Sequence, residues 1–124
     1  MLTSEASRDL GRSLRFLRHA KELTLRDVAK RSGLSPQYVQ NIERGERTNT
    51  SDEAFEKLAR GYAIPLTVIE DLLLKARVVS ALGQRGVDTD GQTFIWRGVE
   101  QRIAELGIEV KTDLAKTVAE LLNA

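Results

Sequence analysis

The sequence contains no cysteine, which excludes disulfide bonds and thiolate metal sites. A single histidine, His19, leaves too few imidazoles for a histidine-based zinc site. No apolar stretch approaches the roughly 18 residues that a membrane-spanning helix needs. The N-terminus also lacks the basic region and apolar run of a secretory signal. We therefore expect a cytoplasmic protein with no bound metal, no cofactor and no membrane association.

Side chains suited to catalysis are equally scarce. A nucleophile and base pair would have to use His19 or carboxylates, and none of these is grouped with a glycine-rich turn. No phosphate-binding glycine loop occurs. We therefore do not expect an enzyme, and we interpret His19 as a solvated helix residue.

The composition is that of a globular, mostly helical protein. Of the 124 residues, 41% are hydrophobic and 30% are charged, and strong helix formers occur throughout. The net charge is only +1, yet residues 1–50 hold 10 Lys and Arg against 6 Asp and Glu. This basic excess favours a polyanionic partner for the N-terminal half.

Apolar residues recur at helical spacing, which predicts an all-α fold with five helices in residues 1–75. The first helix is expected over 8–22, the second from Thr24 to about Arg31, and the third from Ser35 to about Arg44. The fourth begins at Ser51. The fifth begins at Pro65, and its pattern extends as far as residue 82.

Helix-capping residues support these boundaries. Thr24 and Asp27 fit a capping box, and Ser35 followed by Pro36 is typical of a helix start. Gly33 and Gly45 follow the second and third helices, where a left-handed residue commonly ends a helix.

Residues 83–93 contain three glycines and two aspartates and predict a turn-rich boundary. We expect one domain over 1–75 and a helical C-terminal region over 76–124. The apolar stripes of this second region either complete an intramolecular core or pair with another chain, and we favour dimerisation. The expected dimer contacts are Trp96, Val99, Ile103, Leu114, Val118 and Leu121.

Two short helices joined by a glycine turn among three others are what a helix-turn-helix requires, because one helix must brace another that enters the major groove. Ala29 is small enough for the point where the two helices approach, and Gly33 supplies the turn. Val39 and Ile42 are expected to anchor the second helix in the core.

The run from Leu17-Arg18 through Leu25-Arg-Asp-Val-Ala-Lys-Arg-Ser-Gly-Leu-Ser35 to Ile42-Glu-Arg-Gly45 resembles the lambda-repressor-like family of phage repressors, Cro proteins and bacterial regulators. The resemblance covers about residues 10–74. It implies that the third helix presents base-reading side chains to DNA. Those residues are Gln37, Tyr38 and Asn41.

Phosphate contacts follow from the same resemblance and from the positive ends of the second and third helices. Leu25 occupies a position where the family often has a phosphate-binding glutamine, so that contact is in doubt and Arg26 or Arg47 would replace it. The expected phosphate-binding residues are Thr24, Arg26, Ser35, Gln40, Arg47 and Asn49.

The family pattern also brings Arg18 and Glu43 together. We expect a largely structural salt bridge between the first helix and the end of the third. Removing one partner from a buried pair costs about 3–5 kcal/mol.

These features favour a transcriptional regulator that binds double-stranded DNA as a homodimer, more specifically a repressor on an inverted-repeat operator. The first alternative is the antitoxin of a toxin-antitoxin pair, in which residues 76–124 would mask a toxin protein. The second is an interaction module that keeps the fold without DNA binding.

Overall fold

The computed structural model describes residues 2–84, 101 and 103–107. Within them lie the helices α1 (Ser4–Ala20), α2 (Leu25–Ser32), α3 (Pro36–Glu43), α4 (Asp52–Gly61) and α5 (Leu66–Gln84). Residues 101 and 103–105 are also helical, and Gly107 follows with a φ of 68°. The described part contains no strand. The all-α architecture predicted from the sequence is confirmed.

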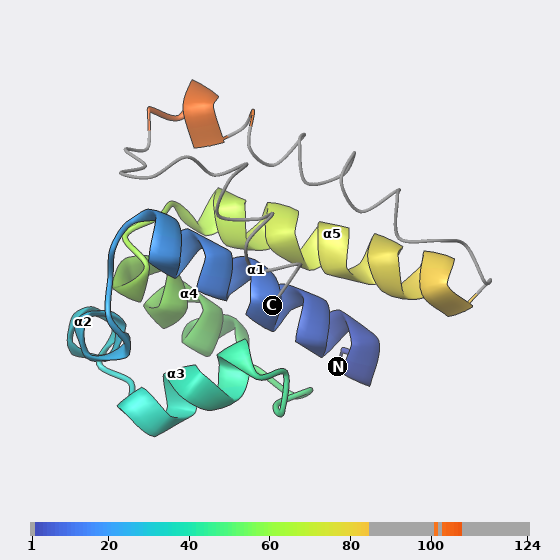
Figure 1. Ribbon diagram of the computed structural model, residues 1–124, viewed down its shortest axis with the longest axis horizontal. Coiled ribbons are helices and arrows are strands. Elements are labelled where there is room, and N and C mark those ends of the chain that lie inside the picture. Colours follow the sequence, from blue (N-terminus) through green and yellow to red (C-terminus); the bar gives the residue numbers. More distant parts are fainter. Residues whose placement is uncertain (1, 85–100, 102, 108–124) are drawn as a thin grey trace.

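Helices α1 and α5 lie side by side in Figure 1, while α3 lies on the opposite side of α1 from α5. The two long helices run antiparallel, because Thr3 at the start of α1 bonds Ser80 and Asp9 further along bonds Lys75. Helix α2 packs on α3 and α4. The helix-turn-helix unit thus lies on the side of the molecule away from α5.

The helix caps form as the sequence predicts. Thr24 and Asp27 make a reciprocal capping box, and the Ser35 hydroxyl accepts from the backbone N–H of Tyr38 over 3.0 Å. Gly33 takes a left-handed φ of 79°. These local bonds satisfy backbone groups that a helix end leaves unpaired.

Two expected boundaries need correction. Helix α1 begins at Ser4 rather than residue 8, because Thr3 provides its N-cap and Ala6 is already buried. It ends at Ala20 rather than residue 22, and Glu22 adopts a left-handed φ of 56°. The first turns lack large apolar residues, so the leucine stripe reveals only the later part of the helix.

Helix α5 continues without a break across the boundary expected near residue 75. Ala76 is fully buried in the core, and the Ser80 hydroxyl lies 2.7 Å from that of Thr3. The second half of α5 therefore packs with α1 rather than standing apart from the first 75 residues.

All the helices contribute to a single apolar core. Three residues expected to pack inside the helix-turn-helix, Ala29, Val39 and Ile42, are buried. Among the described residues, the largest fully buried apolar side chains are Leu14, Leu17, Val28, Val39, Leu58, Tyr62, Val68, Ile69, Leu72 and Ile103.

Ile103 is 2% exposed and belongs to this same core. It therefore completes an intramolecular core, one of the two roles left open by the sequence, and its side chain is not free for the dimer contact we expected. The other expected dimer residues, Trp96, Val99, Leu114, Val118 and Leu121, lie outside the described residues.

A buried ion pair crosses the α1–α5 interface. Lys75 Nζ lies 2.6 Å from Asp9 Oδ2, and the two side chains are 3% and 1% exposed. Burial lowers the pKa of Lys75, and Asp9 opposes this shift. The sequence did not predict this pair, because Asp9 and Lys75 are 66 residues apart in the chain.

None of the helices in the described residues is long and apolar enough to cross a membrane.

Gly11 permits α1 to approach the end of α3. A β-carbon there would lie against the backbone carbonyls of Ile42 and Glu43, 2.5 Å from the Ile42 oxygen. Backbone cannot move aside as a flexible side chain can, so only glycine fits at this crossing.

Gly11→Ala is expected to destabilise the fold by about 1–3 kcal/mol through overpacking, although alanine in a helix interior is intrinsically favoured over glycine by about 1 kcal/mol. Urea unfolding would measure this loss. Arg15→Ala, at an exposed site on the same helix, should change stability by less than about 0.5 kcal/mol. A Gly11→Ala variant as stable as the wild type would contradict the close approach.

Candidate DNA-binding site

Helix α3 is amphipathic, with an apolar face towards the core and a polar face towards solvent. Val39 and Ile42 are 0% and 3% exposed and anchor the helix in the core. Gln37 is exposed, and Asn41, one turn further on, is half-buried. Residues four apart share a face of a helix, so these two amides stand together on the outer side.

The amides of Gln37 and Asn41 form a pair. In one amide orientation Gln37 Nε2 donates to Asn41 Oδ1 over 2.9 Å. In the other, Asn41 Nδ2 faces Gln37 at the same distance and also lies 3.1 Å from Oε2 of Glu46. Either arrangement leaves amide groups able to bond base edges, since each amide carries both donors and an acceptor.

Tyr38 occupies a different environment from the two amides. Its ring is half-buried against the core, and the guanidinium carbon of Arg47 lies 4.3 Å from the ring centroid. This is a cation–π arrangement, and it covers part of the ring. The Arg47 side chain therefore packs against the Tyr38 ring, next to α3.

The hydroxyls expected to hold phosphates already act as helix caps. Thr24 Oγ1 accepts from the N–H of Asp27 and Ser35 Oγ from that of Tyr38, both over 3.0 Å. A hydroxyl that accepts one bond still has its own hydrogen to donate. Both residues are exposed, so each cap can also donate to a phosphate oxygen.

The N-termini of α2 and α3 differ in charge. The Asp27 carboxylate lies at the start of α2, and the hydrogen bond that it accepts from the Thr24 backbone N–H lowers its pKa. The first turn of α3 contains no acidic residue. Because a carboxylate repels phosphate, the start of α3 is the better of the two anion sites.

The remaining predicted phosphate residues are accessible to different degrees. Arg26, Arg47 and Asn49 are exposed, whereas Gln40 is half-buried. Arg47 and Asn49 belong to the loop after α3, so they adjoin the recognition helix in sequence.

The ion pair expected between Arg18 and Glu43 is present and bidentate. Arg18 Nε and Nη2 lie 2.8 and 3.0 Å from the two Glu43 oxygens. The Tyr62 hydroxyl donates to Glu43 Oε2 over 2.6 Å. Burial and the Glu43 charge raise the pKa of Tyr62 well above 10, so the phenol stays neutral as a donor. The sequence did not predict this bond, which joins residues 19 apart in the chain.

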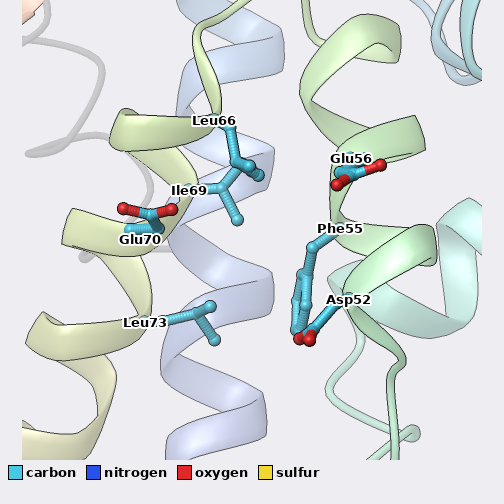
Figure 2. Close-up of a pocket in the computed structure, with 7 residues that line it drawn as sticks. All are labelled: Asp52, Phe55, Glu56, Leu66, Ile69, Glu70 and Leu73. Atoms are coloured by element: carbon cyan, nitrogen blue, oxygen red, sulfur yellow. The ribbon is translucent and has the colours of Figure 1, made fainter.

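A separate hollow of about 300 Å³ lies between α4 and α5. Figure 2 shows Phe55 and Asp52 on α4 facing Ile69 and Leu73 on α5 across it. Its lining includes the carboxylates of Asp52, Glu56 and Glu70. Three acids around an apolar floor are unsuited to phosphate, so this hollow is not part of the nucleic-acid site.

The described residues contain no cluster of three or more His, Cys, Asp or Glu that could hold a metal ion.

A short braced helix, a left-handed glycine turn and an anchored second helix with a polar outer face define a helix-turn-helix protein. The model of the family described as "Helix-turn-helix domain" matches residues 9–72. The HTH-type transcriptional regulator DdrOP3 of Deinococcus deserti is 33% identical over 110 residues, which are 87% of this chain and 76% of the relative.

The uncharacterized HTH-type transcriptional regulator RghRB of Bacillus subtilis is 31% identical over 99 residues, 73% of this chain and 69% of the relative. The chain therefore belongs to the lambda-repressor-like, XRE-type helix-turn-helix family of transcriptional regulators, which are not enzymes. A crystal structure of a mutant of the restriction-modification controller protein C.Esp1396I shares the fold, with a TM-score of 0.51 and 23% identity over 59% of this chain and 96% of that one.

Tyr62→Phe should lower the free energy of unfolding by about 1.5–3 kcal/mol, the typical worth of a hydrogen bond to a charged group. Phenylalanine keeps the ring but leaves Glu43 with Arg18 alone. The half-buried Tyr38 provides a matched control, and Tyr38→Phe should cost less than about 0.5 kcal/mol. Equal losses in urea unfolding for the two variants would contradict a special role for the Tyr62 hydroxyl.

The same pair of variants has a pH signature. Because the folded state raises the pKa of Tyr62, ionisation of this residue in the unfolded chain alone will erode stability as the pH rises above about 10. Tyr62→Phe lacks this contribution and should lose less stability over that range.

Proposed function

We propose that the protein is a sequence-specific repressor that binds an inverted-repeat operator in double-stranded DNA as a homodimer in the cytoplasm. The observation that carries the proposal is the outer face of α3. There the Gln37 and Asn41 amides are paired and accessible on a helix whose inner face is locked by Val39 and Ile42. A helix held rigidly on one side can present the other side to the major groove with little loss of conformational entropy.

In this proposal the two amides contact base edges, and an amide suits adenine because it can donate to N7 and accept from N6. Tyr38 contributes through the ring surface that Arg47 leaves uncovered. The phosphate contacts surround the base-reading amides and fix the register of the helix. They come from Thr24, Arg26, Ser35, Gln40, Arg47 and Asn49.

Dimerisation supplies affinity that a single helix-turn-helix lacks, since one recognition helix covers only a few base pairs. We assign the dimer contacts to the region after residue 75, including Trp96, Val99, Leu114, Val118 and Leu121. In this proposal the exposed apolar side chains of α5, notably Leu74 at 63% and Val78 at 36%, also contact the partner chain. A dimer seated on its operator blocks polymerase sterically, which is why we propose repression.

Gln37→Ala and Asn41→Ala should each weaken binding to the DNA upstream of the protein's own gene by about 1–3 kcal/mol, roughly 5- to 150-fold. Gel shifts with the purified wild type should show two chains per inverted repeat. Gln101→Ala removes the same amide from an exposed site outside α3 and should leave the affinity unchanged. If the wild type binds no upstream DNA even at low salt, the proposal is wrong.

Arg47→Ala should weaken binding to every DNA sequence by a similar factor and reduce the slope of log affinity against log salt by about 1. The physical reason is the loss of one phosphate contact and of the counterion that it releases. Arg77→Ala changes the charge equally at an exposed position on α5, away from α3, and should leave the slope unaltered. Identical slopes for Arg47→Ala and the wild type would rule out this phosphate contact.

A further inference from the structure

The turn that ends the recognition helix brings Glu46 next to Asn41. Gly45 adopts a left-handed φ of 72° and donates to the Ile42 carbonyl over 3.0 Å. The Glu46 N–H then donates to the main-chain carbonyl of Asn41 over 3.0 Å. This pair of bonds is a Schellman motif, and it ties the backbone of Glu46 to the residue that we expect to contact a base.

The Glu46 side chain lies against the same residue. With its amide nitrogen towards Glu46, Asn41 donates to the carboxylate over 3.1 Å. The opposite orientation would set the side-chain oxygen of Asn41, Oδ1, 3.1 Å from the Glu46 carboxylate and 3.3 Å from the main-chain oxygen of Gln37. Three oxygens without a hydrogen between them repel, so the carboxylate favours the first orientation.

The choice passes on to Gln37. In the favoured orientation the Asn41 nitrogen also lies 2.9 Å from the Gln37 amide, which must then offer its oxygen to Asn41 and keep its nitrogen free. The Asn41 oxygen is turned away from Glu46. The donor and acceptor pattern that α3 offers to a base is thereby set before DNA arrives.

We infer that Glu46 is a positioning residue that sets the base preference of α3 by orienting the Asn41 amide. The inference rests on the proposed DNA binding and adds a specificity determinant to it. Without the carboxylate, the Asn41 amide is free to turn over and satisfy alternative bases, because its oxygen and nitrogen are interchangeable in shape. Glu46 itself is exposed, so it contributes no buried charge to stability.

A role in charge alone gives a different result from a positioning role. Removing an exposed carboxylate beside DNA strengthens binding to all sequences by a common factor, since phosphate repulsion decreases. Loss of positioning instead changes the ratio of affinities between bases at one operator position. Base discrimination is therefore the decisive quantity.

The experiment selects binding sites from random double-stranded DNA with the full-length wild type and then measures affinities for operators carrying each base at each position. Asn41→Ala identifies the position that Asn41 contacts, where discrimination should fall by at least about fivefold. Glu46→Ala should reduce discrimination at that same position by a similar factor while leaving the other positions unchanged. Glu46→Gln keeps the size of the side chain, but its amide can accept from or donate to Asn41 in either orientation, so it should lose discrimination at that position as Glu46→Ala does.

The double variant Glu46→Ala with Asn41→Ala completes a thermodynamic cycle. If Glu46 acts through Asn41, the double variant should discriminate no less at this position than Asn41→Ala alone. Unchanged base preference in Glu46→Ala, or a further loss in the double variant, would overturn the inference while leaving the proposed function intact. Failure of the wild type to select any motif would instead overturn the proposed function.

Discussion

The Glu43 carboxylate is the constraint on which the recognition helix depends. It lies buried at the end of α3, where Arg18 of α1 forms a bidentate pair with it and Tyr62, which caps α4, donates a third hydrogen bond. A buried carboxylate without partners is costly, so α3 can end only where both partners reach it. Gly11 allows this by letting α1 approach the α3 carbonyls. The hydrogen bonds of one buried carboxylate therefore hold the end of α3 in position.

A second polar contact sets the other side of α1. The Asp9–Lys75 pair and the Thr3–Ser80 hydroxyls fix the register of the second half of α5 along the first half of α1. Apolar packing between two helices is tolerant of sliding, whereas a buried ion pair is not, because a displaced partner leaves an uncompensated charge. Helix α1 is therefore held to α3 on one side and to α5 on the other. Helix α1 therefore connects α3 to α5, the helix that leads towards the C-terminal region.

Much of this fold follows from short-range patterns in the sequence. Thr24 with Asp27, Ser35 with Pro36, and Ser51 predict the starts of α2, α3 and α4, because a helix cap depends on neighbours within one turn. The Arg18–Glu43 pair came from the family resemblance instead. The Tyr62 bond and the Asp9–Lys75 pair were missed, since each joins residues far apart in the chain whose spacing carries no periodic pattern. The role of Glu46 was hidden similarly, because it depends on the left-handed turn at Gly45 and on the direction of one amide.

The two helices of the helix-turn-helix differ in the charges at their N-termini. Asp27 caps α2 and neutralises its positive end, whereas α3 begins with Ser35 and Pro36 and has no acid in its first turn. Arg47, in the loop after α3, adds a cation over the ring of Tyr38. The cations proposed to bind phosphate therefore lie on α2, as Arg26, and in the loop after α3, as Arg47, while Glu46 is the carboxylate directly after α3. A carboxylate at that place lowers the non-specific attraction to DNA. In the role that we propose for Glu46, its hydrogen bond from Asn41 compensates by giving α3 a defined pattern of donors and acceptors, which favours specificity.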